Sequence, residues 1–202
     1  MSPLAPTLRR RLQTRPTRLM CAAVTVAVTL LSACSNKRHI EWNEEVLLES
    51  GERLMTRRTA LSQPFGQIGG PGGWENEGMT LEITAPVKPD NPTRWSAKFV
   101  PLILDRDNQN GEWFIVATFY SCTSWYELDR PKLPYTEFRF RQGRWVQQAL
   151  SPKFIGRDAN MLTDVQSNGE QASTIEAKRS RMNDPRMAPE YKRVVEKWST
   201  NC

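Results

Sequence analysis

The sequence predicts a mainly β domain: an antiparallel sheet of hairpins, meander-like or sandwich-like, with a C-terminal helix. Two observations predict it. Short segments of alternating apolar and polar residues are separated by turn-forming residues along much of the chain. In addition, residues 113–120 are apolar on both faces, which is typical of a central buried strand. After Pro152 the alternation fades, and an apolar stripe with helical spacing appears near the C-terminus.

The first predicted hairpin spans residues 40–61. Ile40, Trp42 and Leu48 fall on one alternating face of its first strand, with charged residues between them. A polar turn that contains Gly51 reverses the chain, because glycine readily adopts a positive φ. The second strand of the hairpin follows this turn.

Two further strands are predicted between a glycine-rich loop at 64–78 and a turn at 105–111. Residues 79–84 alternate as a strand, and residues 95–104 are apolar apart from an interruption at Pro101. Proline lacks the N–H that a strand ladder needs, so we expect a bulge or an edge position there.

The last third of the chain predicts one more hairpin and then helices. Residues 135–150 form the hairpin, with Gly143 in its turn. The polar segment 173–182 has the composition of a surface helix. A single helical stripe is formed by Tyr191, Val194, Val195 and Trp198. We therefore expect a C-terminal helix over about 189–199, docked on the sheet.

The N-terminal segment 1–33 has the order of a secretory signal. Arginines precede the uncharged apolar run 19–31, and small residues then lead to Cys34. The motif Leu-Ser-Ala-Cys that ends at Cys34 resembles the lipobox of bacterial lipoproteins. This resemblance implies cleavage before Cys34 and lipidation of the cysteine, with palmitate as an expected acyl chain. A plain secretory signal and a membrane helix are the alternatives, although a membrane span needs about 20 apolar residues.

The residue after Cys34 bears on the location of the protein. In the lipoproteins that this signal resembles, an Asp at that position tends to retain the protein in the inner membrane. Ser35 stands there in this chain, so the resemblance implies an outer-membrane anchor with the protein facing the periplasm. We therefore expect a lipidated tether over residues 34–39 and a single domain over 40–202.

Removal of the signal changes the charge of the chain. The formal net charge of +6 falls to +1, because the signal holds five arginines and no acidic residue. The apparent basicity therefore does not predict a nucleic-acid partner. The remaining 169 residues are the size of one ordinary domain.

The cysteines fit an oxidising compartment. Cys21 leaves with the signal and Cys34 accepts the lipid, so Cys122 and Cys202 remain as one candidate disulfide pair. A disulfide between them closes a loop of about 80 residues and stabilises the fold by roughly 4 kcal/mol in the loop-entropy model. The alternative is two unpaired thiols.

No catalytic or metal-binding constellation stands out. The single histidine, His39, is expected in the tether, which argues against Ser-His-Asp and Cys-His catalysis. A carboxylate-dependent hydrolase would draw on acidic residues such as Glu44, Glu45, Asp129 and Glu137. We expect each of these to be a solvated residue. We therefore predict no catalytic residue, no metal and no cofactor.

The segment 122–131 is the strongest candidate for a binding surface. We expect a loop between two strands that presents Trp125, Tyr126 and Arg130. Exposed aromatic residues with an arginine are typical of recognition surfaces. The alternative is that Trp125 and Tyr126 close one end of the core.

Several short motifs extend over most of residues 40–165. They are Glu41–Val46, Ser50–Glu52 with the basic strand after it, Pro131–Tyr135 and Gly143–Trp145. In these motifs the chain resembles a set of uncharacterised proteobacterial lipoproteins. The resemblance implies an envelope location and a β-rich domain, and it assigns no functional residue.

The expected function is that of a binding or envelope-structural module. It is held at the outer membrane by the lipid on Cys34, and its partner is an envelope protein or glycan. The alternative is a carboxylate-dependent hydrolase of envelope glycans or peptides.

Overall fold

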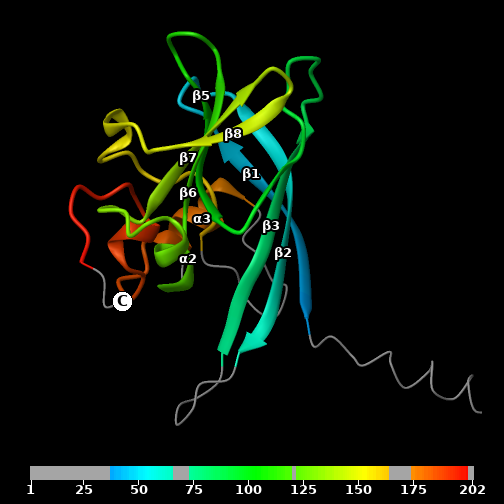
Figure 1. Ribbon diagram of the computed structural model, residues 1–202. Coiled ribbons are helices and arrows are strands. Elements are labelled where there is room, and N and C mark those ends of the chain that lie inside the picture. The colour runs from blue at the N-terminus through cyan, green and yellow to red at the C-terminus, as the bar shows by residue number, and fades with distance from the viewer. Residues whose placement is uncertain (1–36, 66–72, 120–121, 164–173, 200–202) are drawn as a thin grey trace, which may run out of the picture. The chain divides into compact units, whose positions relative to one another are not determined.

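A computed structural model describes residues 37–65, 73–119, 122–163 and 174–199. The chain forms two four-stranded antiparallel sheets (Figure 1), with strand orders β1-β2-β3-β4 in sheet 1 and β5-β6-β7-β8 in sheet 2. The predicted mainly β, antiparallel fold class is therefore confirmed. The predicted signal with Cys34, and the C-terminal Cys202, lie outside the described residues.

Sheet 1 contains the predicted first hairpin and two further strands. Its strands are β1 (Arg38–Leu47), β2 (Arg53–Phe65), β3 (Gly73–Ala85) and β4 (Trp95–Ala97). Gly51 lies in the β1–β2 turn with a φ of 84°, which explains the need for glycine there. The predicted tether is too long by two residues, because β1 begins at Arg38 and His39 is one of its exposed residues.

The loop predicted at 64–78 is also shorter than expected. β2 and β3 continue their pairing into it from both sides, with Ser62 opposite Asn76 and Phe65 opposite Gly73. Antiparallel pairing satisfies the backbone N–H and C=O groups there, despite the glycines in the segment. The remaining loop residues, 66–72, lie outside the described residues.

Sheet 2 differs from the sequence expectation at its first strand, because the segment 95–104, expected as one strand, is divided between β4 of sheet 1 and β5 of sheet 2. Its strands are β5 (Val100–Arg106), β6 (Trp113–Thr118), β7 (Tyr135–Arg141) and β8 (Arg144–Gln148). β6 lies between β5 and β7 and every residue in it is buried, as its apolar composition predicted. β5 is an edge strand with a register shift between Pro101 and Ile103, so the expected interruption at Pro101 is confirmed.

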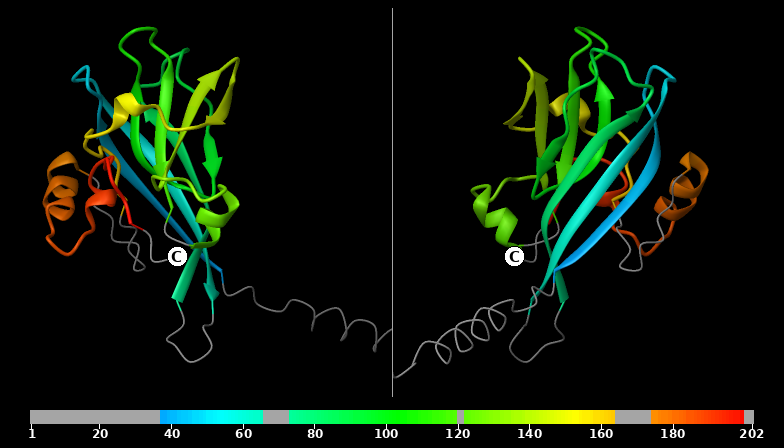
Figure 2. Two further views of the ribbon diagram at one scale, coloured as in Figure 1. Left: turned by 60° about the vertical axis from the view of Figure 1, so that its left-hand side comes forward. Right: turned by 90° about the vertical axis from the view of Figure 1, so that its right-hand side faces the viewer.

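The two sheets pack face to face (Figure 2), and their inner faces share one hydrophobic core. Trp95 of sheet 1 meets Phe138 of sheet 2 edge to face, with ring centroids 5.3 Å apart. The outer face of sheet 2 is also buried. There Phe114 packs against Phe154, which belongs to the short 3-10 turn η1 (Pro152–Phe154), in a second core that also contains Val194.

The helices differ in part from the expectation. α3 (Ile175–Met182) is the surface helix predicted over 173–182, and the side chain of Thr174 caps it by accepting a hydrogen bond from the Ala177 amide at 3.1 Å. The prediction of a helix over about 189–199 is wrong. The segment holds only the 3-10 turn η2 (Pro189–Tyr191) and then extended backbone. Among the described residues, no helix has the length and apolar character that crossing a bilayer requires.

In the extended tail, Val194 of the predicted stripe is buried, and Tyr191, Val195 and Trp198 are partly buried. Val194 donates its amide to the Arg157 carbonyl at 2.9 Å and accepts the Gly156 amide at 2.7 Å. Arg193 also forms an isolated bridge with Asp158. These bonds take the place of helical hydrogen bonds, so the apolar side chains dock on sheet 2 from an extended backbone.

Candidate functional site

The segment expected as a binding loop begins as a short helix, α2 (Cys122–Glu127), none of whose residues is buried. The loop expectation is therefore corrected. Asp129 and Arg130 have positive φ angles of 59° and 56° and end the helix. The Arg130 amide closes it by donating to the Trp125 carbonyl at 2.9 Å, which is the hydrogen bond that a left-handed helix end makes.

The structure brings together the three binding residues predicted from the sequence, Trp125, Tyr126 and Arg130, which we call the aromatic surface. The rings of Trp125 and Tyr126 lie 5.1 Å apart at their centroids, and the Arg130 guanidinium lies 5.3 Å from the Tyr126 ring. Trp125 is half-buried and donates its indole N–H to the Pro131 carbonyl at 3.2 Å. Tyr126 is 50% exposed, so the two rings do not close the core.

A groove of about 740 Å³ adjoins the aromatic surface. It is lined by Leu128, Pro131, Lys132, Leu133, Tyr135, Thr136, Gln147, Gln148, Ala149, Leu150, Pro152 and Ile155. Most of these side chains are apolar. Sequence reasoning missed the groove because it is assembled from the segment after α2, the end of β8 and the chain around η1.

A buried charge cluster on sheet 1 was also missed, although Glu44 was named as a solvated acid. Glu44 is fully buried and accepts hydrogen bonds from Trp42 Nε1 at 2.9 Å, Arg58 Nη1 at 2.9 Å and the Leu162 amide at 3.0 Å. Lys178 of α3 adds a bond from its Nζ at 3.2 Å. We call Glu44, Arg58 and Lys178 the Glu44 cluster.

The cluster explains how Glu44 stays charged in the interior. Burial raises the pKa of this carboxyl, but the positive charges of Arg58 and Lys178 and its hydrogen bonds outweigh burial and hold the pKa below its ordinary value. A sequence signal was present, because Glu44 lies between Trp42 and Val46 on the same alternating face. Arg58 likewise faces inward, opposite Trp42 in the β1–β2 register.

A second buried network lies on the outer face of sheet 2 and corrects the expectation for Glu137. Glu137 is fully buried, forms an ion pair with Arg139, and accepts the Ser151 amide at 2.9 Å. Arg139 also pairs with Asp107 at 2.8 Å, and Lys153 pairs with the same carboxylate. Hydrogen bonds from Lys153 and Arg139 hold the pKa of Asp107 well below its usual range.

These two networks leave Glu44 and Glu137 without the properties of an acid–base pair. Each is fully engaged by cations and backbone amides. Asp105 is different, because burial raises its pKa. However, it already accepts hydrogen bonds from the Glu49 and Arg106 amides at 2.9 Å and 2.7 Å and pairs with Arg157. The geometry of these carboxylates therefore favours a structural role over general acid–base catalysis.

Metal binding has no support among the residues that the structure describes. Within them, no group of three or more His, Cys, Asp or Glu side chains is placed to hold an ion.

Cys122 is disulfide-bonded, but its partner is not among the described residues. The predicted pairing of Cys122 with Cys202 therefore stays a prediction.

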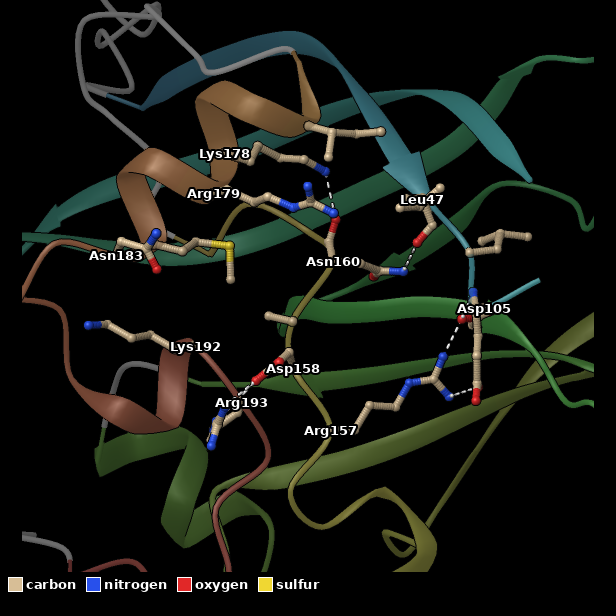
Figure 3. Close-up of a pocket in the computed structure, with 15 residues that line it drawn as sticks. Leu47, Asp105, Arg157, Asp158, Asn160, Lys178, Arg179, Asn183, Lys192 and Arg193 are labelled. Atoms are coloured by element: carbon tan, nitrogen blue, oxygen red, sulfur yellow. Dashed lines mark hydrogen bonds and ion pairs between the residues drawn. The ribbon is translucent and has the colours of Figure 1, made fainter. Parts of the chain in front are cut away.

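A cleft of about 700 Å³ lies between α3, the end of β1, the segment 157–160 and the tail after η2 (Figure 3). Its lining is mixed. Apolar side chains include Leu47, Ala159, Ile175 and Met182, and charged ones include Glu49, Asp105, Arg157, Asp158, Lys178, Arg179, Lys192 and Arg193. Asn160 holds the segments together, because its side-chain amide donates to the Leu47 and Leu104 carbonyls at 3.0 Å and 2.8 Å.

These features define a mainly β protein of two packed antiparallel sheets, with an aromatic surface beside an apolar groove and a separate charged cleft. No protein-family model, curated protein or solved structure matches the chain. Its function is therefore argued from its own residues.

Proposed function

We propose that this protein is an outer-membrane lipoprotein, held by a lipid on Cys34, that binds a protein segment of the envelope through the aromatic surface and the groove. The observation that carries the proposal is the exposure of Tyr126. Half of its surface is open to solvent, Trp125 and Arg130 both lie against its ring, and Leu128 and Pro131 of the same segment line the groove. Tyr, Trp and Arg are the residue types that most often dominate binding energy.

The groove favours a protein segment over a glycan. Its walls include Leu128, Leu133, Leu150 and Ile155, and Ile155 is one of the few large apolar side chains that are exposed in the described part of the chain. Apolar side chains of a partner gain free energy by leaving water for such a surface. Lys132 in the lining of the groove and Arg130 of the aromatic surface can supply polar contacts for orientation.

The backbone that carries the aromatic surface is preorganised. The hydrogen bond from the Arg130 amide to the Trp125 carbonyl and the bond from Trp125 Nε1 to the Pro131 carbonyl join both ends of the segment. A surface that is already ordered loses less conformational entropy when a partner binds. The aromatic surface therefore suits direct docking of a partner.

The anchor is supported by the signal-like order of residues 1–33 and the motif before Cys34. Stable membrane attachment needs more than one acyl chain, which the resemblance to lipoproteins implies. Replacement of Cys34 by Ser is expected to abolish uptake of labelled palmitate by the protein. Continued labelling of the Cys34→Ser chain would show that the lipid is attached to another residue and would contradict the proposed anchor.

The binding surface is tested by placing a photo-crosslinking amino acid at Tyr126 in the full chain in intact envelopes. A matched control places it at Val87, which is 84% exposed and belongs to neither the aromatic surface nor the groove. We expect discrete protein adducts from position 126 and none of the same size from position 87. Adducts that are removed by a muramidase but resist protease would identify a glycan partner and contradict the proposal, as would identical products from both positions.

A further inference from the structure

The cleft at α3 carries more positive charge than its acidic residues neutralise. Its lining includes five cations and three acids. All three acids are already paired: Glu49 and Asp105 both with Arg157, and Asp158 with Arg193 at 2.7 Å. The other three cations, Lys178, Arg179 and Lys192, therefore find no carboxylate within the cleft lining.

These three cations differ in what they contact. Arg179 is exposed, and its guanidinium has no hydrogen-bond or ion-pair partner among the residues that the structure describes. Lys192 donates to the Asp184 carbonyl at 2.7 Å, which is a neutral partner. Lys178 donates to the Asn160 carbonyl at 2.6 Å and to Glu44 at 3.2 Å, but Glu44 is shared with Arg58.

The Glu44 cluster therefore places a surplus positive charge behind the cleft wall. One carboxylate faces two cations in it, and all three side chains are buried. Burial lowers the pKa of Lys178, and the attraction of Glu44 offsets this only in part. An anion in the cleft would compensate the surplus, because electrostatic interactions are stronger at a partly desolvated site than in water.

We propose that the cleft binds a small organic anion whose carboxylate or phosphate group interacts with Lys178 and Arg179. Figure 3 shows both side chains reaching from α3 into the cleft toward Asn160. The ammonium of Lys178 has three donors and uses two of them. The guanidinium of Arg179 adds a fork that matches both oxyanions.

The rest of the lining indicates the body of the ligand. Leu47, Ala159, Ile175 and Met182 provide apolar walls next to the cations. A volume of about 700 Å³ lies within the range of small-molecule sites. The ligand class is therefore a small molecule with one anionic group and an apolar portion.

This site is independent of the proposed protein-binding function. The cleft and the groove have no lining residue in common, and the aromatic surface belongs to neither the cleft wall nor α3. Loss of one function by substitution therefore leaves the other testable.

The test uses the full chain in neutral detergent with methyl-labelled methionine, so that Met182 reports on the cleft by NMR. The probes are butanoate, butyl phosphate and butanol, which share an apolar body and differ in the head group. We expect at least one anion to shift the Met182 signal at about tenfold lower concentration than butanol. The anion with the lower midpoint then identifies the preferred head group.

Arg179→Gln is expected to raise the midpoint for that anion about tenfold. The matched control is Arg144→Gln, which removes one exposed arginine on β8 outside the cleft and is expected to leave the midpoint unchanged. The proposal is overturned if butanol matches both anions, if neither anion shifts Met182, or if Arg144→Gln weakens binding as much as Arg179→Gln.

Discussion

The two sheets each bury a charge network, and the networks differ in their balance. On sheet 2, the buried Arg139 and the partly exposed Arg141 and Lys153 face three acids, Asp107, Glu112 and Glu137. On sheet 1, Glu44 faces two cations, Arg58 and Lys178, and Glu45 attracts Lys178 more weakly. A network with equal numbers of cations and acids has no net charge to compensate. A network with an excess of cations favours the approach of an anion from solvent. Both networks tie residues of the fold together, but only the one on sheet 1 also borders the proposed ligand site.

Their surroundings agree with this distinction. Arg139 lies under aromatic rings, with its guanidinium 5.1 Å from the Phe114 ring and 5.8 Å from the Phe154 ring. Lys178 instead lines the cleft, so its ammonium lies at the boundary between the core and solvent. The sheet 1 cluster can therefore respond to a molecule bound in the cleft without opening the core.

The largest effect is expected from Glu44→Ala, which leaves Arg58 and Lys178 buried without a carboxylate. The free energy of unfolding should fall by about 3–5 kcal/mol, because removing one partner leaves uncompensated buried charge. Denaturant unfolding of the full chain measures it. Glu41→Ala on the exposed face of β1 is the control, and a loss no larger than that of the control would show that the cluster does not stabilise the fold.

A smaller effect is expected from Glu137→Gln on sheet 2. The amide can still accept the Ser151 N–H, and Arg139 keeps its pairs with Asp107 and Glu112. The expected loss is about 2 kcal/mol, as for a charged hydrogen bond that is weakened without leaving its partner alone. The same unfolding experiment measures it. A loss equal to that of Glu44→Ala would remove the distinction between the two networks.

The smallest effect is expected from acid, because protonated Glu44 remains in place and still accepts some hydrogen bonds. The pKa of Glu44 is lowered on folding from its ordinary value of 4.5. Its contribution to stability is therefore complete above pH 4.5 and is lost as the pH falls through the folded-state pKa. Between pH 6 and pH 3, the free energy of unfolding should fall more steeply for the native chain than for Glu44→Gln. Parallel curves would contradict the lowered pKa.

Local chemistry explains which parts of the fold the sequence could predict. Gly51 and Gly143 mark turns through their positive φ angles, and Pro101 marks the irregular edge strand. These signals act within a few residues. The prediction of a helix in the tail was wrong because distant residues decide its backbone. The apolar stripe has helical spacing, but hydrogen bonds to residues 156–158, far earlier in the chain, hold the tail extended.

The candidate sites divide in the same way. Trp125, Tyr126 and Arg130 are near neighbours in sequence, so their composition predicted a shared surface. The Glu44 cluster joins residues 134 positions apart, Glu44 and Lys178, and no local pattern contains that pairing. The alternation of β1 places Glu44 on the apolar face, but its partner on α3 follows only from the tertiary fold.

The start of β1 at Arg38 limits the distance between the proposed lipid anchor and sheet 1. Three residues separate Arg38 from Cys34, and four extended steps of chain span at most about 14 Å. In the proposed lipoprotein, a lipid on Cys34 would therefore hold the Arg38 end of β1 close to the bilayer. The cleft borders the opposite end of that strand, at Leu47, roughly 30 Å further along at the rise of an extended strand. In the proposed lipoprotein, the cleft therefore lies at the end of β1 that is remote from the membrane anchor.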